Sequence, residues 1–440
     1  MDAVHVLVIL SLTVLGLACL AAVAYFIVVW ARRASAGGGA QVPESTPIQE
    51  HVSRGRACNW RAARAVDCTF QQVTVVGVAP VGEGVEPALP AGVQFGFQVV
   101  GTPTQAYVAA PQAVATEGVV FEVTNGTNVG QALQVPDPQG GDAFGTYLAA
   151  TGSQVFAWLS SGQVWSIGQN PLRQLEVPSV ATRTIDGLVA RSPHLVANWF
   201  LNSTPSTRGG FEWHEFGTTD EHKAWSYYVR LDDLENVRAF GSNVEMLTQS
   251  SGLTTLRQYT QTNPDLPGTV WTFQTLILDP GLVPVLTWGD QVAVAECGLF
   301  ACVQGTIAGS LPIVTHMYRD SITDPWLASS TYLNELSPNS GFGASMAMSA
   351  TGAVVVIGSP TATEAGQANR GRADVYVRDA SNGLVHVQEL APKASLVSNA
   401  GLFFGHQVLV NAEGTTVLVA GYGTSISGYV QVFTLTLDPV

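Results

Sequence analysis

From residue 341 the chain reads GFGASMAMSATGAVVVIGSP, followed by GRADVYVRD and LVHVQELAP, and this stretch decides the fold class. Residues 403–437 repeat the pattern with FFGHQVLVNAEGTTVLVAGYG and GYVQVFTLTL. Each copy has a Phe-Gly start, a short strand, a glycine turn, a Val-rich strand and an alternating aromatic strand. Short alternating apolar runs bounded by Gly predict β-strands joined by tight turns.

Weaker copies of this unit recur upstream with a period near fifty, which indicates a repeat architecture. The marker glycines are separated by 49, 96, 48, 54 and 62 residues. The gap of 96 is twice the period, so we expect one further copy near residue 187. The repeat markers are Phe95 and Gly96, Phe144 and Gly145, Phe240 and Gly241, Trp288 and Gly289, Phe342 and Gly343, and Phe404 and Gly405.

The repeat count predicts an all-β fold, a seven-bladed β-propeller spanning residues 67–440. Each unit has the strand content of one blade, and closing the ring leaves only short protected edges. The last unit lacks a fourth strand, and residues 68–78 form a strand without a unit, so we expect this strand to close the ring. An open solenoid is the alternative, and it requires polar caps that the sequence does not show.

The phrases FGASMAMSATGAVVVIGSP and ADVYV resemble FG-GAP repeats, the blades of the integrin α-chain propeller and of many bacterial and viral surface proteins. This resemblance implies a ring that binds macromolecules without chemistry of its own. The calcium loops of that family are not matched, because residues 349–352 and 411–414 hold one carboxylate between them. Calcium requires several oxygen ligands together, so we expect no metal there. Residues 161–175 also resemble one repeat of the regulators of chromosome condensation, another seven-bladed propeller family.

Residues 3–31 form an uncharged apolar run of 29 residues, which predicts one N-terminal transmembrane helix. A helix of this length reaches about 43 Å, more than the hydrocarbon core of a bilayer. A cleaved signal peptide is the alternative, but it needs a basic start and a shorter apolar run. We therefore expect a membrane anchor over residues 1–33, followed by a flexible Gly/Pro-rich and then Arg-rich linker over residues 34–66. The predicted location is a membrane, with a single pass.

The side of the membrane on which the propeller lies stays open. Arginines follow the helix and none precedes it, which favours a cytoplasmic propeller. Two close cysteine pairs, Cys58 with Cys68 and Cys297 with Cys302, favour an oxidising compartment if they form disulfides. Four free thiols are the alternative, since spacing alone does not establish geometry.

Charge excludes one class of partner. Residues 1–64 hold six of the 19 basic groups and three of the 33 acidic groups, which leaves 13 and 30 for the remainder of the chain. This excess of negative charge repels phosphate, so we expect no nucleic acid partner.

No motif for catalysis or cofactor binding occurs, neither a phosphate loop nor a nucleophile elbow nor a C-x-x-C pair. The best polar cluster is His214, Glu215, Asp220, Glu221 and His222, but neighbouring strand residues face opposite sides, so we interpret it as a polar hairpin. We expect no enzyme activity, no cofactor and no metal. Tryptophans within strands are interpreted as packing between blades, and loop tryptophans such as Trp326 as candidate contact residues.

The sequence thus predicts a single-pass membrane protein whose propeller recognises or adheres to a protein or glycan through one face. The first alternative is a structural protein of a virion or of a membrane-containing large DNA virus. The second, disfavoured alternative is a propeller hydrolase. The predicted partners are the lipid bilayer, through residues 3–31, and one protein or glycan ligand.

Overall fold

The computed structural model describes residues 73–439, except for 86–88, 102–104, 125–127, 152–153, 160–162, 168–172, 176–182, 192–193, 202–207, 216–224, 231–236, 242–244, 251–254, 262–270, 279–284, 296, 308–310, 322–323, 334–338, 365, 393–400 and 424–426. These residues belong to one unit, Trp60–Val440. The predicted anchor and linker therefore lie outside the described residues. Within the described ranges no helix is long and apolar enough to span a membrane.

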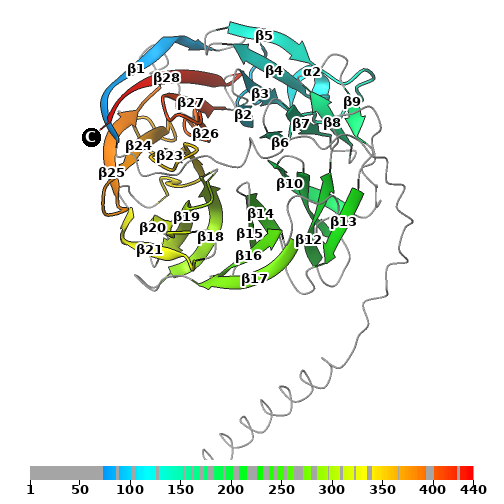
Figure 1. Ribbon diagram of the computed structural model, residues 1–440. Helices are drawn as coiled ribbons and strands as arrows, with labels where there is room; N and C mark the ends of the chain where they lie inside the picture. Colours follow the sequence, from blue (N-terminus) through cyan, green and yellow to red (C-terminus); the bar gives the residue numbers. More distant parts are fainter. Residues whose placement is uncertain are drawn as a thin grey trace, which may run out of the picture. The chain divides into compact units, whose positions relative to one another are not determined.

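The described strands pair into seven four-stranded antiparallel sheets, shown side by side in Figure 1. The first three contain β2 (Val99–Gly101), β3 (Ala106–Ala110), β4 (Val119–Thr124) and β5 (Asn128–Leu133); β6 (Leu148–Thr151), β7 (Gln154–Trp158), β8 (Val164–Ile167) and β9 (Arg173–Leu175); and β10 (Arg183–Arg191), β11 (His194–Leu201), β12 (Arg208–Glu215) and β13 (Trp225–Arg230). The short helix α2 (Ala113–Thr116) lies between β3 and β4.

The next three sheets follow the same order along the chain. They contain β14 (Val237–Gly241), β15 (Glu245–Ser250), β16 (Thr255–Gln261) and β17 (Trp271–Leu278); β18 (Val285–Val294), β19 (Phe300–Ile307), β20 (Leu311–Tyr318) and β21 (Leu327–Leu333); and β22 (Ser345–Met348), β23 (Val354–Ser359), β24 (Arg372–Arg378) and β25 (Leu384–Leu390). The last sheet combines both ends of the described chain. It contains β26 (Gln407–Val410), β27 (Thr416–Gly421), β28 (Tyr429–Pro439) and β1 (Val73–Val85).

The sheets are linked through their first strands, and β26 of the last sheet contacts β2 of the first. In order, the contacting first strands are β2, β6, β10, β14, β18, β22 and β26. The strand β1 pairs with β28 from Val73 opposite Pro439 to Val85 opposite Val430, so it extends beyond the predicted end at residue 78. This arrangement of four-stranded sheets in a cycle of contacts is an all-β, propeller-like fold.

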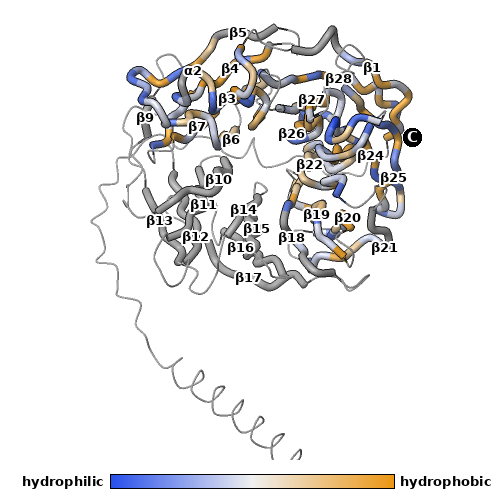
Figure 2. Tube along the Cα trace, turned by 180° about the vertical axis from the view of Figure 1, so that it is seen from behind, coloured by the Kyte–Doolittle hydropathy of each residue, from blue (hydrophilic) through white to orange (hydrophobic). Residues whose placement is uncertain are grey.

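Among the described side chains, apolar clusters fill the spaces between several pairs of neighbouring sheets. One cluster joins Val108 and Val119 of the first sheet to Leu418 and Val430 of the last. Figure 2 shows hydrophobic segments running along strands such as β1 and β4. The last and first sheets therefore share a core of the same kind as the sheets that are neighbours in sequence.

Three of the Phe-Gly markers form a turn that fastens a sheet to the sheet before it. Phe95, Phe144, Phe342 and Phe404 are at most 1% exposed. At three junctions the backbone N–H of this phenylalanine donates to a carbonyl just before the third strand of the preceding sheet: Phe144 to Glu117, Phe404 to Arg370 and Phe95 to Ser427. The last of these bonds joins the first sheet to the final sheet.

Glycine is required on both sides of this junction. Four marker glycines, Gly96, Gly145, Gly343 and Gly405, have positive φ, and so do Gly118, Gly371 and Gly428, which precede the third strands. A Cβ at any of these last three would collide with the backbone of the phenylalanine that lies against it. A side chain there would also favour a different φ, so only glycine permits this close approach.

Two of the markers lie differently from the others. Phe240 and Gly241 are the last residues of β14, and Trp288 and Gly289 lie inside β18 rather than in a turn before it. Trp288 is nevertheless fully buried. β18 has an irregular register between Trp288 and Val292, where the ladder to β19 is interrupted.

The predicted pairing of Cys297 with Cys302 is wrong, because Cys302 is a free, fully buried thiol. The strand register places Cys302 opposite Ala293 on one side and His316 on the other. Cys302 packs in an apolar cluster with residues of the next sheet, and burial raises the pKa of its thiol. Cys297 is disulfide-bonded. Cys58 and Cys68 lie outside the described residues.

Candidate functional site

Four ring side chains gather where the last and first sheets meet, and we call Phe97, Phe403, His406 and Tyr422 the aromatic quartet. Phe97 lies just before β2, and Phe403 and His406 lie just before β26. Tyr422 directly follows β27. In antiparallel strands, the start of β26 and the end of β27 lie at the same end of the sheet. Contact between β2 and β26 brings Phe97 to that end as well.

Tyr422 is the centre of the quartet. Its ring centroid lies 4.5 Å from that of His406, 5.5 Å from Phe97 and 6.1 Å from Phe403. The His406 and Tyr422 rings meet edge to face, a favoured arrangement for aromatic pairs. All four side chains are half-buried, so the quartet combines rigid packing with an accessible surface.

Phe403 holds a backbone conformation that large side chains disfavour. It has φ 50°, and the corresponding residues of the other Phe-Gly turns are Gln94 (60°), Ala143 (46°) and Gly341 (67°). All four accept a turn hydrogen bond from the N–H three residues later. The turn therefore demands a left-handed residue, and a phenylalanine there costs about 1–2 kcal/mol.

The quartet carries no positive charge at neutral pH. Burial lowers the pKa of His406 to about 4, so its imidazole is neutral at pH 7. Burial also raises the pKa of the Tyr422 hydroxyl, which remains protonated. The quartet thus offers uncharged rings with electron-rich faces.

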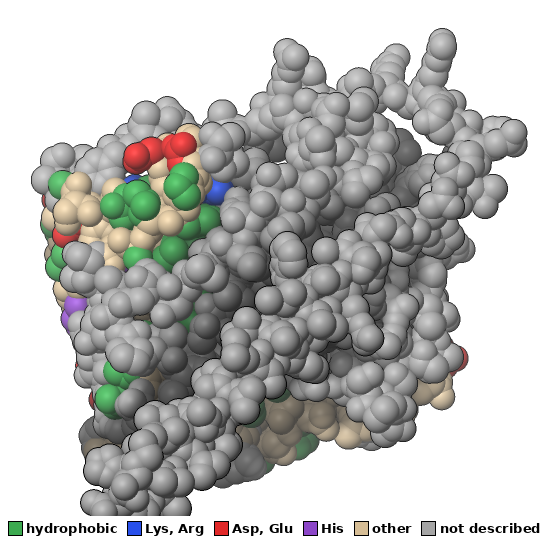
Figure 3. All heavy atoms as spheres, turned by 90° about the horizontal axis from the view of Figure 1, so that it is seen from below, with side chains coloured by type: hydrophobic (Ala, Val, Ile, Leu, Met, Phe, Trp, Pro, Cys, Tyr) green, Lys and Arg blue, Asp and Glu red, His purple; other side chains and the backbone are tan. Residues whose placement is uncertain are grey.

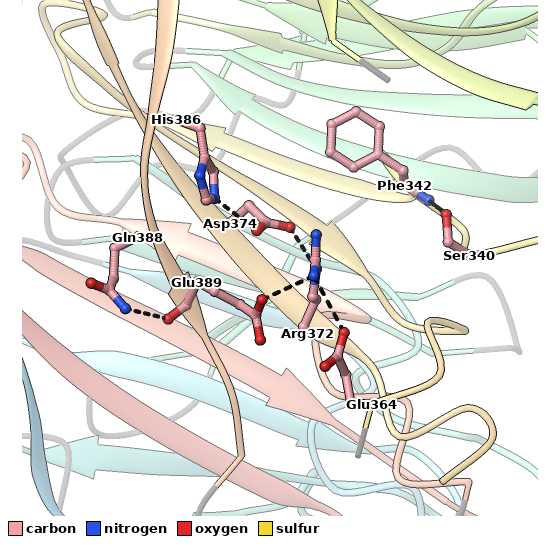
Figure 4. A network of polar contacts seen from close by, with 8 residues as sticks. All are labelled: Ser340, Phe342, Glu364, Arg372, Asp374, His386, Gln388 and Glu389. Carbon is pink, nitrogen blue, oxygen red and sulfur yellow. Dashed lines mark hydrogen bonds and ion pairs between the residues drawn. The ribbon is translucent and has the colours of Figure 1, made fainter. Parts of the chain in front are cut away.

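An acidic network adjoins the quartet along the backbone. The N–H of Phe403 donates to the carbonyl of Asn369, and Gly371 forms a parallel bridge with Phe404. The segment that carries Phe403 therefore runs beside the segment that leads into Arg372. Arg372 is the only basic residue of the network, and its guanidinium contacts three carboxylates (Figure 4).

The guanidinium of Arg372 lies 3.1 Å from Asp374, 2.9 Å from Glu389 and 3.4 Å from Glu364. Asp374 also bonds His386 Nε2 at 3.0 Å (Figure 4), and its own side chain is inaccessible to solvent. These contacts link β24, β25 and the loop that follows β23.

Carboxylates outnumber guanidinium groups in this network, and the titration behaviour reflects this excess. Burial raises the pKa of Asp374, and Arg372 lowers it only in part. Burial and Glu389 raise the pKa of Glu364. Burial lowers the pKa of Arg372, but the surrounding carboxylates outweigh it and the net shift is upward. The network therefore holds three carboxylates around one guanidinium.

The Asp374–His386 pair has no nucleophile in place. Among the described residues, no hydroxyl or thiol is hydrogen-bonded to the other ring nitrogen of His386, which packs edge to face against Tyr376. Within the described ranges, no group of three or more His, Cys, Asp or Glu side chains could hold a metal ion.

A second polar group lies buried between the sheets β18–β21 and β22–β25. His316 is 1% exposed, and its Nδ1 lies 2.8 Å from the carbonyl oxygen of Asn382. The Arg378 guanidinium lies 3.6 Å above the ring of Phe300, which stacks on His316. Burial and Arg378 lower the pKa of His316 to about 4, against the effect of its hydrogen bond. This group joins two sheets and is not open to a ligand.

Of the residues that the sequence singled out, the markers Phe95, Phe144 and Phe404 are structural parts of the junctions between sheets. Trp326 is half-buried beneath the Arg319 guanidinium, 4.4 Å from its ring centroid. His214 and Glu215 end β12, whereas residues 216–224 of the same polar cluster lie outside the described residues.

Sequence reasoning missed the aromatic quartet and the Arg372 network. One signal was present: the residue after the marker glycine is aromatic or imidazole at Phe97 and His406, but Thr146 and Ala344 in two other repeats. Its meaning depends on contact between β2 and β26, which are far apart in sequence.

Apolar and acidic side chains also lie side by side on the described surface of one face of the molecule, seen from below in Figure 3. This combination agrees with the excess of acidic residues in the chain.

Comparisons with known proteins support the fold. The chain is similar to the WD40 domain of Toxoplasma gondii coronin, at 10% identity and TM-score 0.52, over 83% of this chain and 87% of that one. It also matches the β-propeller domain of Cps50 (Swd1) from Myceliophthora thermophila, at 11% identity and TM-score 0.49, over 83% and 100%. No protein-family model matches, and no curated protein sequence is significantly similar. At 10% identity the likeness to the coronin domain shows a propeller-like fold and nothing about the ligand.

Proposed function

We propose that this chain is a non-catalytic recognition module, a seven-bladed β-propeller held at a membrane by residues 3–31, which binds a protein partner. The blade number rests on the seven four-stranded sheets and the cyclic contacts of their first strands. The FG-GAP resemblance agrees with the repeated Phe-Gly junctions. A propeller displays its connections at the ends of its sheets, where partner contacts form on a rigid scaffold.

The aromatic quartet carries this proposal. Aromatic residues are enriched in the cores of protein interfaces because they bury large areas with little loss of side-chain freedom. Phe97, Phe403 and Tyr422 form a half-buried group of this kind at one end of the last and first sheets. Among the described Phe-Gly turns, Phe403 is an aromatic side chain at a position where the other repeats carry Gln94, Ala143 and Gly341.

Adhesion at a surface is the favoured setting for this module, and a structural role in a virion or viral membrane is the alternative. Protease digestion of the native protein in sealed membranes distinguishes the side on which the propeller lies. High copy number in a purified particle would favour the structural role. A glycan ligand is the alternative to a protein, and the negative charge of the chain disfavours nucleic acid.

The test uses the full-length chain in non-ionic detergent against arrays of peptides and glycans. We expect selective ligands whose affinity falls about tenfold in Tyr422→Leu, as for loss of a central interface aromatic. Trp165→Leu is the matched control, because Trp165 is a half-buried aromatic in a different sheet, outside the quartet. Ligands that bind both variants as they bind the wild type would overturn the assignment of the site, and so would the absence of any selective ligand.

A further inference from the structure

We infer that the aromatic quartet receives a cationic side chain, arginine or lysine, from a basic segment of a protein partner. This inference rests on the proposed function and names the ligand chemistry of the same site. The occupant follows from three properties of the described residues: half-buried aromatic rings, the absence of positive charge within the quartet, and the acidic network on the neighbouring segment.

Ring faces attract cations. A guanidinium or ammonium within about 6 Å of an aromatic centroid is stabilised by the negative face of the ring. The chain already uses this contact internally, since Arg378 lies 3.6 Å above Phe300 and Arg319 lies 4.4 Å from Trp326. In the quartet, Phe97, Phe403 and Tyr422 are half-buried rings, and no contact of this kind involves them among the described residues.

The surrounding charge selects a cation over an uncharged ring ligand such as a sugar. His406 is neutral at pH 7, so it does not repel a cation. Glu364 and Glu389 keep 20% and 39% of their side-chain surface exposed while sharing Arg372 with the buried Asp374. The segment from Asn369 to Arg372 that leads into this network runs directly beside Phe403. A bound cation would therefore contact rings on a segment that runs beside the segment leading into the acidic network.

Replacing the side chain of Phe403 can change binding without lowering the stability of the protein. Glycine occupies the same turn position in another repeat, at Gly341, with φ 67°. Phe403→Gly would remove one ring and relieve the left-handed strain. We therefore expect this variant to bind more weakly while unfolding no more easily than the wild type. Ala143→Gly is the matched control, because Ala143 holds the equivalent turn position in the sheet β6–β9, outside the quartet.

The experiment measures binding of the full-length chain, in non-ionic detergent, to immobilised twelve-residue peptides. One peptide carries four arginines among glycine and serine, a second carries lysines instead, and a third carries glutamines. We expect the arginine and lysine peptides to bind at least tenfold more tightly than the glutamine peptide. Binding should weaken as salt rises. Tyr422→Leu and Phe403→Gly should each weaken it about tenfold, and Ala143→Gly should leave it unchanged.

Equal binding of all three peptides would overturn the inference. Undiminished arginine-peptide binding by Tyr422→Leu and Phe403→Gly would also overturn it, because attraction would then come from the acidic surface as a whole. If array ligands are uncharged glycans that Tyr422→Leu loses, while basic peptides do not bind, the cationic ligand is wrong and the recognition site stands. Only the absence of any quartet-dependent ligand would count against both.

Discussion

Single residues at the junctions explain why Gly recurs beside Phe throughout this chain. The backbone N–H of Phe95 reaches the carbonyl of Ser427, and Gly428 beside it has φ 121°. The same pairing joins Phe144 to the Gly118 segment and Phe404 to the Gly371 segment. A phenylalanine fills the space between two sheets, and glycine lets its backbone come close.

Replacing Gly428 should therefore be far more damaging than replacing a glycine in open space. In Gly428→Ala the new Cβ would collide with the carbonyl oxygen of Phe95, in addition to the strain of a positive φ. We expect the free energy of unfolding to fall by about 3 kcal/mol or more. Gly92→Ala is the control, because Gly92 has φ 82° with nothing near its Cβ position, so only about 1 kcal/mol should be lost. Denaturant unfolding of both variants measures the difference, and equal losses would show that the Phe95 contact contributes nothing.

Secondary-structure elements are held together across sheet boundaries by buried polar groups as well as apolar ones. β20 presents His316 to the turn after β24, where Nδ1 donates to the carbonyl of Asn382. A neutral imidazole satisfies this bond, and the neighbouring Arg378 opposes a second positive charge. Contact between these two sheets therefore depends on the protonation state of one side chain.

The sign of the resulting pH dependence follows from the lowered pKa. Unfolded His316 takes a proton near pH 6.5, whereas the folded protein resists protonation until about pH 4. Stability therefore does not change through this group above pH 6.5 and falls as pH decreases from 6.5 to 4, by up to about 3 kcal/mol. In His316→Gln the contribution of residue 316 to the pH dependence of stability should disappear. The contribution of His406, whose pKa is also lowered by burial, should remain.

Denaturant unfolding at pH 7.5, 5.5 and 4.5 tests this dependence for the wild type and His316→Gln. The glutamine amide can still donate to Asn382, so we expect the two proteins to converge as pH falls. Parallel curves for the two proteins would mean that His316 is not the titrating group.

At the scale of the whole molecule, the last sheet combines strands from the two ends of the described chain. β1 pairs with β28 over most of its length, and Val75 and Val78 pack against the cluster between the sixth and last sheets. Val76 is 57% exposed and lies at an irregularity of the register between Val75 and Gly77, which brings Val75 and Val78 to the same face. The free edge of β28 is covered in this way by a strand far away in sequence.

The closing strand should contribute to the stability of the entire ring. Val75→Asp places a charge against the apolar cluster. We therefore expect the free energy of unfolding to fall by about 2 kcal/mol or more. Val76→Asp is the neighbouring control on the exposed face and should change stability by no more than about 0.5 kcal/mol. Circular dichroism during denaturant unfolding follows all sheets at once. A Val75→Asp protein that unfolds like the control would show that β1 does not hold the ring closed.

The all-β, repeated character of this chain could be predicted from sequence, because each repeat carries its own alternation, glycine turns and Phe-Gly pair within about fifty residues. Strand β24 is an example: buried residues occur throughout it, as expected for a strand covered on both faces. The predicted anchor over residues 3–31 also depends only on local composition, and it remains a prediction.

Contacts between distant residues were decided by the tertiary structure alone. Cys302 and Cys297 are close in sequence, yet strand register directs Cys302 into the core opposite His316. Phe97 and Tyr422 are separated by most of the chain, yet their rings lie 5.5 Å apart because the last sheet contacts the first. Local patterns determine which segments become strands, since they depend on neighbours along the chain. Register and ring closure determine which side chains meet, and no local pattern encodes those long-range contacts.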